Sequence, residues 1–382
     1  MQNNVKDTNA DRVRRAALAL AAALYAVAGS PTPDHPGGIE VTIIVLILLA
    51  VLPLRRPRGI WVAPLLALVA YGLTLPLIGG VLMGNDAADM LRDLVAFAAL
   101  ALPLGLAALY APGHGRDLVY LMLGIGLVFS LRFLLGAAAP FGGPHDLLYL
   151  ANSPLVAFAA AFLLLYGCFA ARRARDALAA LVLSVPPVLA MTGMMQRATL
   201  ALLALAWCAL LVRAWVLVPR RALMISLGFA ALAALLWSPL AWLAAQLYDK
   251  TLAVGVNARG DELAALVDQL GQNPLTALFG AGWGALVKSP AVGDLWVRFS
   301  HALLSALLWK TGWIGLALAG AALAALTVHA WRRLAGDWVM RAALFLPLVP
   351  ALFLYGSYKS FGFGLLLTGL ATADWTKPKQ EW

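Results

Sequence analysis

Apolar runs of about 17 to 25 residues recur along the whole of this 382-residue chain, and each is long enough as a helix to cross roughly 30 Å of hydrocarbon. The composition agrees with this pattern. Hydrophobic residues make up 63% of the chain and charged residues 12%, against about 45–50% and about 25% in soluble domains. A soluble fold is therefore excluded, and the sequence predicts an all-α integral membrane protein.

We expect about twelve transmembrane helices. Their apolar centres are residues 16–30, 39–54, 59–79, 94–110, 118–139, 153–171, 177–195, 198–218, 222–247, 302–331, 338–357 and 359–374. Clusters of Pro and Gly, as in 31–38 and 140–144, separate several of them, because these residues end helices. The prediction divides the chain into spans one to nine (1–247), a large loop with short helices (248–300), and spans ten to twelve with the C-terminus (301–382).

The basic residues predict an orientation. Arginine clusters precede span one and follow spans two, six, eight and ten, and all five fall on one side if twelve spans alternate. By the positive-inside rule that side is cytoplasmic, together with both termini. The net charge of +10 is therefore mostly a topology signal, and nucleic acid is not an expected partner. The first apolar stretch lacks a small-residue cleavage site, so we expect a signal anchor.

The loop 248–300 is the largest feature of the opposite face, and a loop of this length is usually functional. Residues 261–270 predict a short amphipathic helix with Asp261 and Glu262 in its first turn, where the helix dipole favours acids. Residues 279–284, Phe-Gly-Ala-Gly-Trp-Gly, form a glycine-rich turn. Span ten is too long for the bilayer if it begins at residue 301, so we expect its first two turns to stand outside the hydrocarbon.

Polar residues near the outer face are expensive there and are therefore functional candidates. The basic residues assigned away from the cytoplasm are Arg92, Arg132, Arg197, Lys250, Arg259, Lys288, Arg298, Lys310 and Lys359. Arg197 lies in a tight outer turn, Arg259 lies in the large loop, and Arg132 lies about a turn and a half inside the outer end of span five. The alternatives are snorkelling for Arg197 and Arg132 and a local ion pair for Arg259.

Among the histidines, His301 differs from the others because it stands at the start of span ten, directly after the large loop. The others are expected in exposed loops or at the cytoplasmic interface: His35, His114, His145 and His329. The two cysteines, Cys168 and Cys208, lie within predicted spans and lack a CxxC spacing, so they predict neither a disulfide nor a metal framework.

The segment around His301 resembles the O-antigen ligase family, whose polytopic members carry the pattern His-Asn-x-x-Leu-x-x-Leu-x-x-x-Gly-x-x-Gly-Leu after their largest periplasmic loop. The matching residues are His301, Leu304, Leu307 or Leu308, Gly312, Gly315 and Leu316, while the family's Asn is Ala302 here. The glycine-rich turn also resembles one in that family. Arg197 and Arg259 occupy the outer turn and loop where the family places essential arginines. The resemblance is specific over about residues 197–316.

This resemblance implies a GT-C-like glycosyltransferase in the bacterial inner membrane with its active site facing the periplasm. It would transfer a glycan from undecaprenyl diphosphate to a sugar hydroxyl on lipid A-core. His301 would act as general base, because an ordinary histidine pKa of about 6.5 leaves the ring mostly neutral at pH 7. Arg197 and Arg259 would bind the diphosphate, with possible support from Arg132, because guanidinium groups bind phosphate oxygens bidentately. Direct displacement would invert the anomeric centre, and no metal or other cofactor is expected.

Four alternatives remain at the sequence level. The related O-antigen polymerase uses the same donor chemistry but tends to have two sizeable outer loops. A secondary transporter or flippase also fits twelve spans, although transporters usually concentrate polar groups near the midplane. A structural scaffold would need none of the three candidate residues. A metal-dependent transferase would use Asp261 with Glu262, or Asp86 with Asp89, as ligands.

Overall fold

The computed structural model describes residues 8–31, 37–52, 57–110, 114–137, 145–254, 259–298, 300–354 and 356–373. Apart from one small hairpin, its regular elements are helices. This agrees with the predicted all-α class. The predictions for His35 and for the break at 140–144 fall outside the described residues, as does the side chain of His145.

The elements follow one another in this order: α1 (Asn9–Val27), α2 (Gly38–Val51), α3 (Val62–Gly72), α4 (Leu75–Leu82), α5 (Ala87–Tyr110), α6 (Gly115–Leu134), α7 (His145–Ala151), α8 (Pro154–Leu165), the π-helix η1 (Tyr166–Ala170), α9 (Ala174–Gly193), α10 (Arg197–Leu217), α11 (Pro219–Leu235), α12 (Trp237–Val254), α13 (Arg259–Gly271), α14 (Pro274–Phe279), β1 (Val287–Ser289), the 3₁₀-helix η2 (Pro290–Val292), β2 (Leu295–Val297), α15 (Leu303–Arg333), α16 (Trp338–Phe345), α17 (Leu348–Phe353), the 3₁₀-helix η3 (Gly356–Tyr358) and α18 (Phe361–Ala371).

All twelve predicted apolar runs form helices, but they differ in length. In the described part of the chain, six helices are long and apolar enough to cross a membrane: α3 with α4, α5, α6, α9, α10 and α15. The number rises to seven if α11 and α12, which meet at an angle of 80°, form one broken span. The other runs form α1 and the shorter apolar helices α2, α8 with η1, α16 with α17, and α18. The chain is thus a helical protein of membrane type, and the count of twelve spans stays a prediction.

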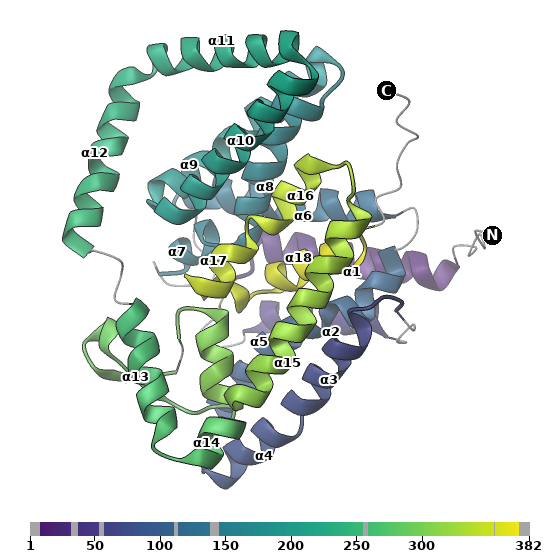
Figure 1. Cartoon of the computed structure of the whole chain (residues 1–382). Coiled ribbons are helices and arrows are strands. Elements are labelled where there is room, and N and C mark those ends of the chain that lie inside the picture. Colours follow the sequence, from purple (N-terminus) through teal and green to yellow (C-terminus); the bar gives the residue numbers. More distant parts are fainter. Residues whose placement is uncertain are drawn as a thin grey trace.

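Helix α18 lies in the middle of the bundle (Figure 1), packed by α5, α6, α8 and α15. All of its residues from Gly362 to Ala371 are buried. A helix that is apolar on every side is stable only when other elements surround it. At about 1.5 Å per residue it is only about 16 Å long, so protein rather than lipid covers its faces.

Helices α9 to α12 show the opposite pattern. Large apolar side chains such as Val216, Leu235 and Trp237 are each more than 70% exposed. Figure 1 shows α11 running across the top of the molecule and α12 descending at the left, away from the central bundle. Exposed apolar surface of this extent is destabilising in water, and it is the surface that a bilayer would cover.

Three arginines join the ends of neighbouring helices. Arg14 of α1 donates to the last carbonyls of α2, at 2.8 and 3.0 Å. Arg221 of α11 donates to carbonyls at the end of η1, at 3.1 and 3.0 Å. Arg132 of α6 donates to carbonyls at the end of α1, at 2.9 Å each. Carbonyls at helix ends lack intrahelical partners, so these cations satisfy them and fix which helix ends lie together.

The described residues of the predicted large loop form short elements. Residues 261–270, predicted to be an amphipathic helix, lie within α13, and Asp261 and Glu262 occupy its first turn as expected. Helix α14 and an antiparallel hairpin follow, with Val287 of β1 opposite Val297 of β2. Figure 1 shows α13 and α14 beside the start of α15. The elements of the loop thus gather around the segment that contains His301.

Candidate functional site

The site forms where α15 is broken. Gly312 has φ +66° and ψ −171°, a conformation outside the helix region, and it divides α15 into a short first segment and a long second one. The break leaves carbonyls of the first segment without their helical partners. The Trp309 carbonyl accepts from Ala281 N at 2.8 Å, and the Thr311 carbonyl accepts from the Tyr71 hydroxyl at 2.8 Å. A physical break therefore separates the first turns of span ten from the rest of it, while the position of these turns outside the hydrocarbon stays a prediction.

The glycine-rich turn docks against this break. Gly280, Gly282 and Gly284 have φ of +85°, +79° and +81°, values that favour glycine. A side chain at Gly280 would overlap the Lys310 carbonyl, and one at Gly282 would overlap the Gly80 backbone. The glycines are thus required by both conformation and close approach.

Trp283 fixes the turn to a second broken helix. Pro76 of α4 lacks the N–H that would bond the Gly72 carbonyl, so this carbonyl is left for another donor. It accepts from Trp283 Nε1 at 2.7 Å, and Trp283 N donates to the Pro76 carbonyl at 3.0 Å. Asn85 adds two bonds from its side-chain nitrogen to carbonyls of the turn, at 3.1 and 2.8 Å.

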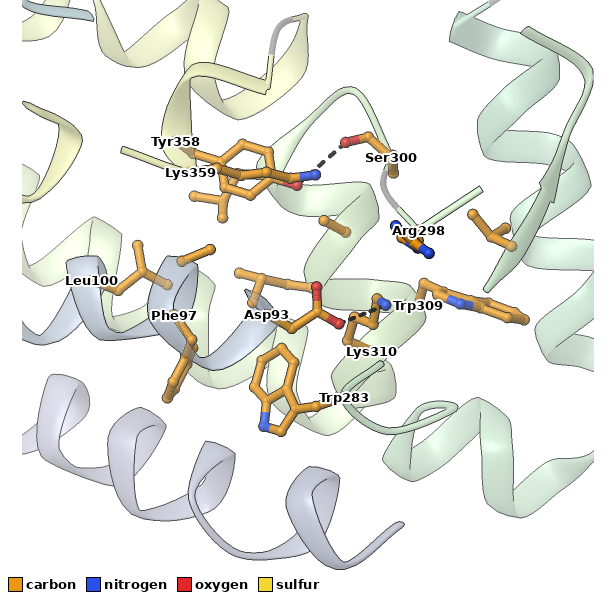
Figure 2. A pocket seen from close by; sticks show the side chains of 15 residues that line it. Asp93, Phe97, Leu100, Trp283, Arg298, Ser300, Trp309, Lys310, Tyr358 and Lys359 are labelled. Carbon is orange, nitrogen blue, oxygen red and sulfur yellow. Dashed lines mark hydrogen bonds and ion pairs between the residues drawn. The ribbon is translucent and has the colours of Figure 1, made fainter. Parts of the chain in front are cut away.

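A pocket opens above the turn, between α5, the first segment of α15, and the connection from η3 to α18 (Figure 2). Its charged side chains are Asp93, Arg298, Lys310 and Lys359. Its aromatic side chains are Phe97, Trp283, Trp309 and Tyr358. The combination of an apolar lining and a few converging polar groups is typical of small-molecule sites.

An ion pair lies at the floor of this pocket. Lys310 Nζ is 2.6 Å from Asp93 Oδ2, and both side chains are largely buried, at 6% and 14% exposure. Asp93 Oδ2 also accepts from Gly284 N at 2.7 Å, and Lys310 donates to the Ala285 carbonyl. Asp93 therefore joins α5, the glycine-rich turn and α15. At the rim, Arg298 Nε lies 2.9 Å from Asp89 Oδ1.

His301 lies beside the pocket in contact with a buried acid. Its Nδ1 is 3.1 Å from each oxygen of Glu262, and the side chains of His301 and Glu262 are 24% and 3% exposed. Ser289 Oγ donates to Glu262 Oε1 at 3.3 Å. A ring nitrogen that faces a carboxylate carries the proton, so Nε2 is the atom that can accept one. The site thus has an oriented histidine at its edge.

Ser300 connects His301 to the pocket. It lines the pocket, and its side chain bonds the Ser305 hydroxyl. The Tyr358 hydroxyl donates to the Ser300 carbonyl at 3.3 Å. Burial, with Asp93 and Glu262 nearby, raises the pKa of Tyr358 well above its usual range, so the hydroxyl remains a donor. The backbone immediately before His301 is therefore held in place.

The predicted cationic residues take up different positions. Arg259 begins α13, one turn before Glu262, but its side chain lies outside the described part of the structure. Arg197 begins α10, and its Nη1 donates to Thr251 of α12 at 2.8 Å. Arg132 contacts the end of α1, as described above. Among the described residues that line the pocket, neither Arg132 nor Arg197 occurs.

Three of the four carboxylates considered as metal ligands, Asp86, Asp89 and Glu262, make other contacts. Asp86 caps α5 by accepting from the N–H groups of Ala88 and Asp89, at 3.0 and 3.1 Å. Asp89 pairs with Arg298, and Glu262 contacts His301. Within the ranges that the structure describes, no group of three or more His, Cys, Asp or Glu side chains converges as a metal site would.

Two of the acids in the site were missed by sequence reasoning. The sequence does not single out Asp93, and it indicates for Glu262 only the roles of a helix-start acid or a metal ligand. Arg298, Lys310 and Lys359 belong to the outer-face cations, but sequence could not place them relative to the site. The only sequence property that relates these three cations to one another is their predicted position on the same side of the membrane.

Fold and site together define a helical protein with helices of membrane-spanning length and a polar pocket near the ends of several helices. The chain matches no protein-family model, and no curated protein sequence matches it.

Proposed function

We propose that this protein is a membrane glycosyltransferase of the O-antigen ligase type. It transfers a glycan from undecaprenyl diphosphate to a sugar hydroxyl of lipid A-core, at the periplasmic face of the bacterial inner membrane. The observation that carries the proposal is the contact of His301 with the buried Glu262 at the edge of a polar pocket. This arrangement supplies the oriented base that activation of a hydroxyl requires.

In the proposed reaction the acceptor oxygen attacks the anomeric carbon of the donor glycan. The bond between that carbon and the diphosphate oxygen breaks, and its electron pair leaves with the diphosphate. His301 Nε2 takes the acceptor proton, and Glu262 stabilises the resulting imidazolium through Nδ1–H. A single displacement of this kind inverts the anomeric centre.

The leaving diphosphate needs cations, and Arg197 and Arg259 are the proposed ligands. In the described backbone, Arg259 is the first residue of α13, one turn before Glu262. Arg132 is at most a supporting residue in this proposal, since its guanidinium is engaged by the end of α1. The proposed chemistry uses these side chains as the counter-charge and requires no metal.

The fold supports a position of this reaction on the periplasmic side of the membrane. Alternation of twelve spans places the starts of α5, α15 and α18 on the outer face, and residues of α5, of α15 and of the connection before α18 line the pocket. The bonds of Arg14 and Arg221 join helix ends that the same alternation places in the cytoplasm. Both sets of contacts favour twelve spans, cytoplasmic termini and a periplasmic site.

The test is transfer by the purified chain in nanodiscs, with a lipid-linked glycan donor and lipid A-core as acceptor. His301→Ala should lower the rate by about 10²–10⁴-fold, the usual contribution of a general base. Lys288→Ala is the matched control, because the Lys288 side chain is exposed on β1 and should transfer normally. Wild-type transfer by His301→Ala would disprove the proposal, and abolition of transfer by EDTA would disprove its metal-free mechanism.

Three further measurements, in nanodiscs, in liposomes and in cells, separate the alternative functions. A polymerase would prefer a second lipid-linked glycan over lipid A-core as the acceptor. A transporter or flippase would move substrate across liposomes with His301→Ala largely intact. A scaffold would support surface display of polymer after alanine substitution at Arg197, Arg259 or His301.

A further inference from the structure

We propose that the pocket above the glycine-rich turn binds two neighbouring hydroxyls on one edge of a neutral sugar ring. This inference rests on the proposed function for the identity of the substrates. It adds a saccharide subsite, formed by Asp93, Arg298 and Lys359, that the roles of His301 and the diphosphate-binding arginines do not include. The sugar belongs either to the acceptor or to the donor glycan, and the experiment below distinguishes them.

The first observation is the orientation of Asp93. Its Oδ2 is engaged by Lys310 and by Gly284 N. Figure 2 shows the other carboxylate oxygen directed away from Lys310 towards the middle of the pocket. No described residue hydrogen-bonds this second oxygen. The pocket therefore presents one negatively charged acceptor at its centre.

The second observation is that donors surround this acceptor. Arg298 uses Nε for Asp89, and its two terminal nitrogens make no hydrogen bond with any residue in the described ranges. Lys359 lines the opposite wall (Figure 2). A hydroxyl both donates and accepts hydrogen bonds. It can therefore donate to Asp93 and accept from Arg298 or Lys359 at the same time. A phosphate only accepts, and its charge would face the Asp93 oxygen with repulsion. The arrangement therefore favours a neutral polyol over an anion.

The third observation is the size and lining of the pocket. The cavity has a volume of about 30 Å³, and a water-sized group needs about 10–15 Å³ on this measure. Two hydroxyls fit, but a whole ring does not. The ring would remain at the mouth, where Arg298 is half-exposed, with its apolar face towards the aromatic side chains. Ser300 lines the pocket and precedes His301, so a ring held there lies beside the proposed base.

Binding can be measured without catalysis. Saturation-transfer NMR on the full chain in nanodiscs would use methyl glucoside, methyl galactoside and methyl mannoside as probes, with pyrophosphate as competitor. At least one hexoside should bind with its signal concentrated on one ring edge, and pyrophosphate should not displace it. Asp93→Asn and Lys359→Met should each weaken binding at least tenfold, while Lys288→Met should bind as the wild type does. Thermal unfolding of each variant checks that it is folded. If Asp93→Asn does not fold, binding by Lys359→Met decides the test.

The substrate source follows from transfer kinetics of the same variants. A raised KM for lipid A-core assigns the sugar to the acceptor, and a raised KM for the lipid-linked glycan assigns it to the donor. The inference is overturned if no hexoside binds, if both variants bind as the wild type does, or if pyrophosphate displaces the sugar. His301→Ala separates the two proposals: it should still bind the hexoside, whereas its undiminished transfer would disprove the proposed function alone.

Discussion

The contact between His301 and Glu262 predicts a graded series of activities. Glu262→Gln keeps the shape of the side chain but removes the charge that orients the ring and stabilises the imidazolium, so transfer should fall by roughly tenfold or more. Glu262→Asp should recover part of the lost rate. Ser289→Ala, which removes only the hydroxyl on Glu262 Oε1, should have a much smaller effect.

These rates are measured with purified, folded variants under saturating donor and acceptor. The loss should appear in kcat more than in KM, because the carboxylate acts on the histidine and not on the substrate. Equal kcat for Glu262→Gln and the wild type would show that Glu262 only packs against His301.

The ion pair between Lys310 and Asp93 predicts an effect on stability. Lys310→Met leaves a largely buried carboxylate without its cation, which typically costs about 3–5 kcal/mol. The double variant Lys310→Met with Asp93→Asn should be more stable than Lys310→Met alone, because the uncompensated charge is gone. Denaturation of detergent-solubilised protein measures both, and equal stability of the two variants would contradict this account.

At the residue scale, sequence predicted the positions with a local signal and missed those without one. His301 stands out because it follows the large loop and begins a span. Glu262 is 39 residues away from His301, and Asp93 contacts Lys310 across an even longer separation. Neither acid has a neighbouring pattern that indicates its partner. Contacts of this kind depend on tertiary packing, which no local pattern encodes.

At the scale of elements, the break in α15 predicts a strict need for glycine at one position. Gly312 has a positive φ with an extended ψ, a combination that is essentially confined to glycine. A Cβ there would overlap the Leu278 carbonyl and the Gly280 backbone. Gly312→Ala should therefore destabilise the protein and lower transfer, because the segment that positions His301 loses its contact with the turn.

Gly320→Ala is the matched control within the same helix. No atom lies within 4 Å of a Cβ built at Gly320, and alanine favours a helix over glycine by about 1 kcal/mol. This variant should be as stable as the wild type or slightly more so in thermal unfolding. Equal stability of Gly312→Ala and Gly320→Ala would show that the break is not required.

Sequence predicted the twelve apolar runs and the helix at 261–270, but neither the short helices α7 and α14 nor the places where the helices break. Length and hydrophobicity were enough for the runs, since both are local properties. The bend between α11 and α12 lies at Leu236, and Pro239 lacks the N–H that would bond the Leu235 carbonyl. Pro347 separates α16 from α17 in the same way. These prolines were visible in the sequence, whereas the break at Gly312 depends on a turn that packs against it.

At the scale of the whole molecule, the distribution of charge and the fold predict one topology. Helices α1 and α2 are the most informative test, because α2 has only 14 residues and α1 carries several charged residues. Alternation places the start of α2 outside and the segment after α2 inside. A hairpin that enters and leaves on the cytoplasmic side would instead place both of these positions inside.

Single cysteines distinguish these topologies in intact cells. In a background with Cys168 and Cys208 replaced by alanine, Gly38→Cys should react with a membrane-impermeant maleimide from outside, while Arg58→Cys should react only after permeabilisation. A Cβ at position 38 would have no atom within 4 Å, and Arg58 is exposed. Neither substitution should therefore disturb packing. Lys288→Cys, on the same predicted side as the pocket, should label like Gly38→Cys. If the maleimide labels Lys288→Cys but not Gly38→Cys from outside, the chain has two spans fewer and the pocket still lies on the outer face. If neither cysteine is labelled from outside, the pocket lies on the cytoplasmic side, which contradicts transfer at the periplasmic face.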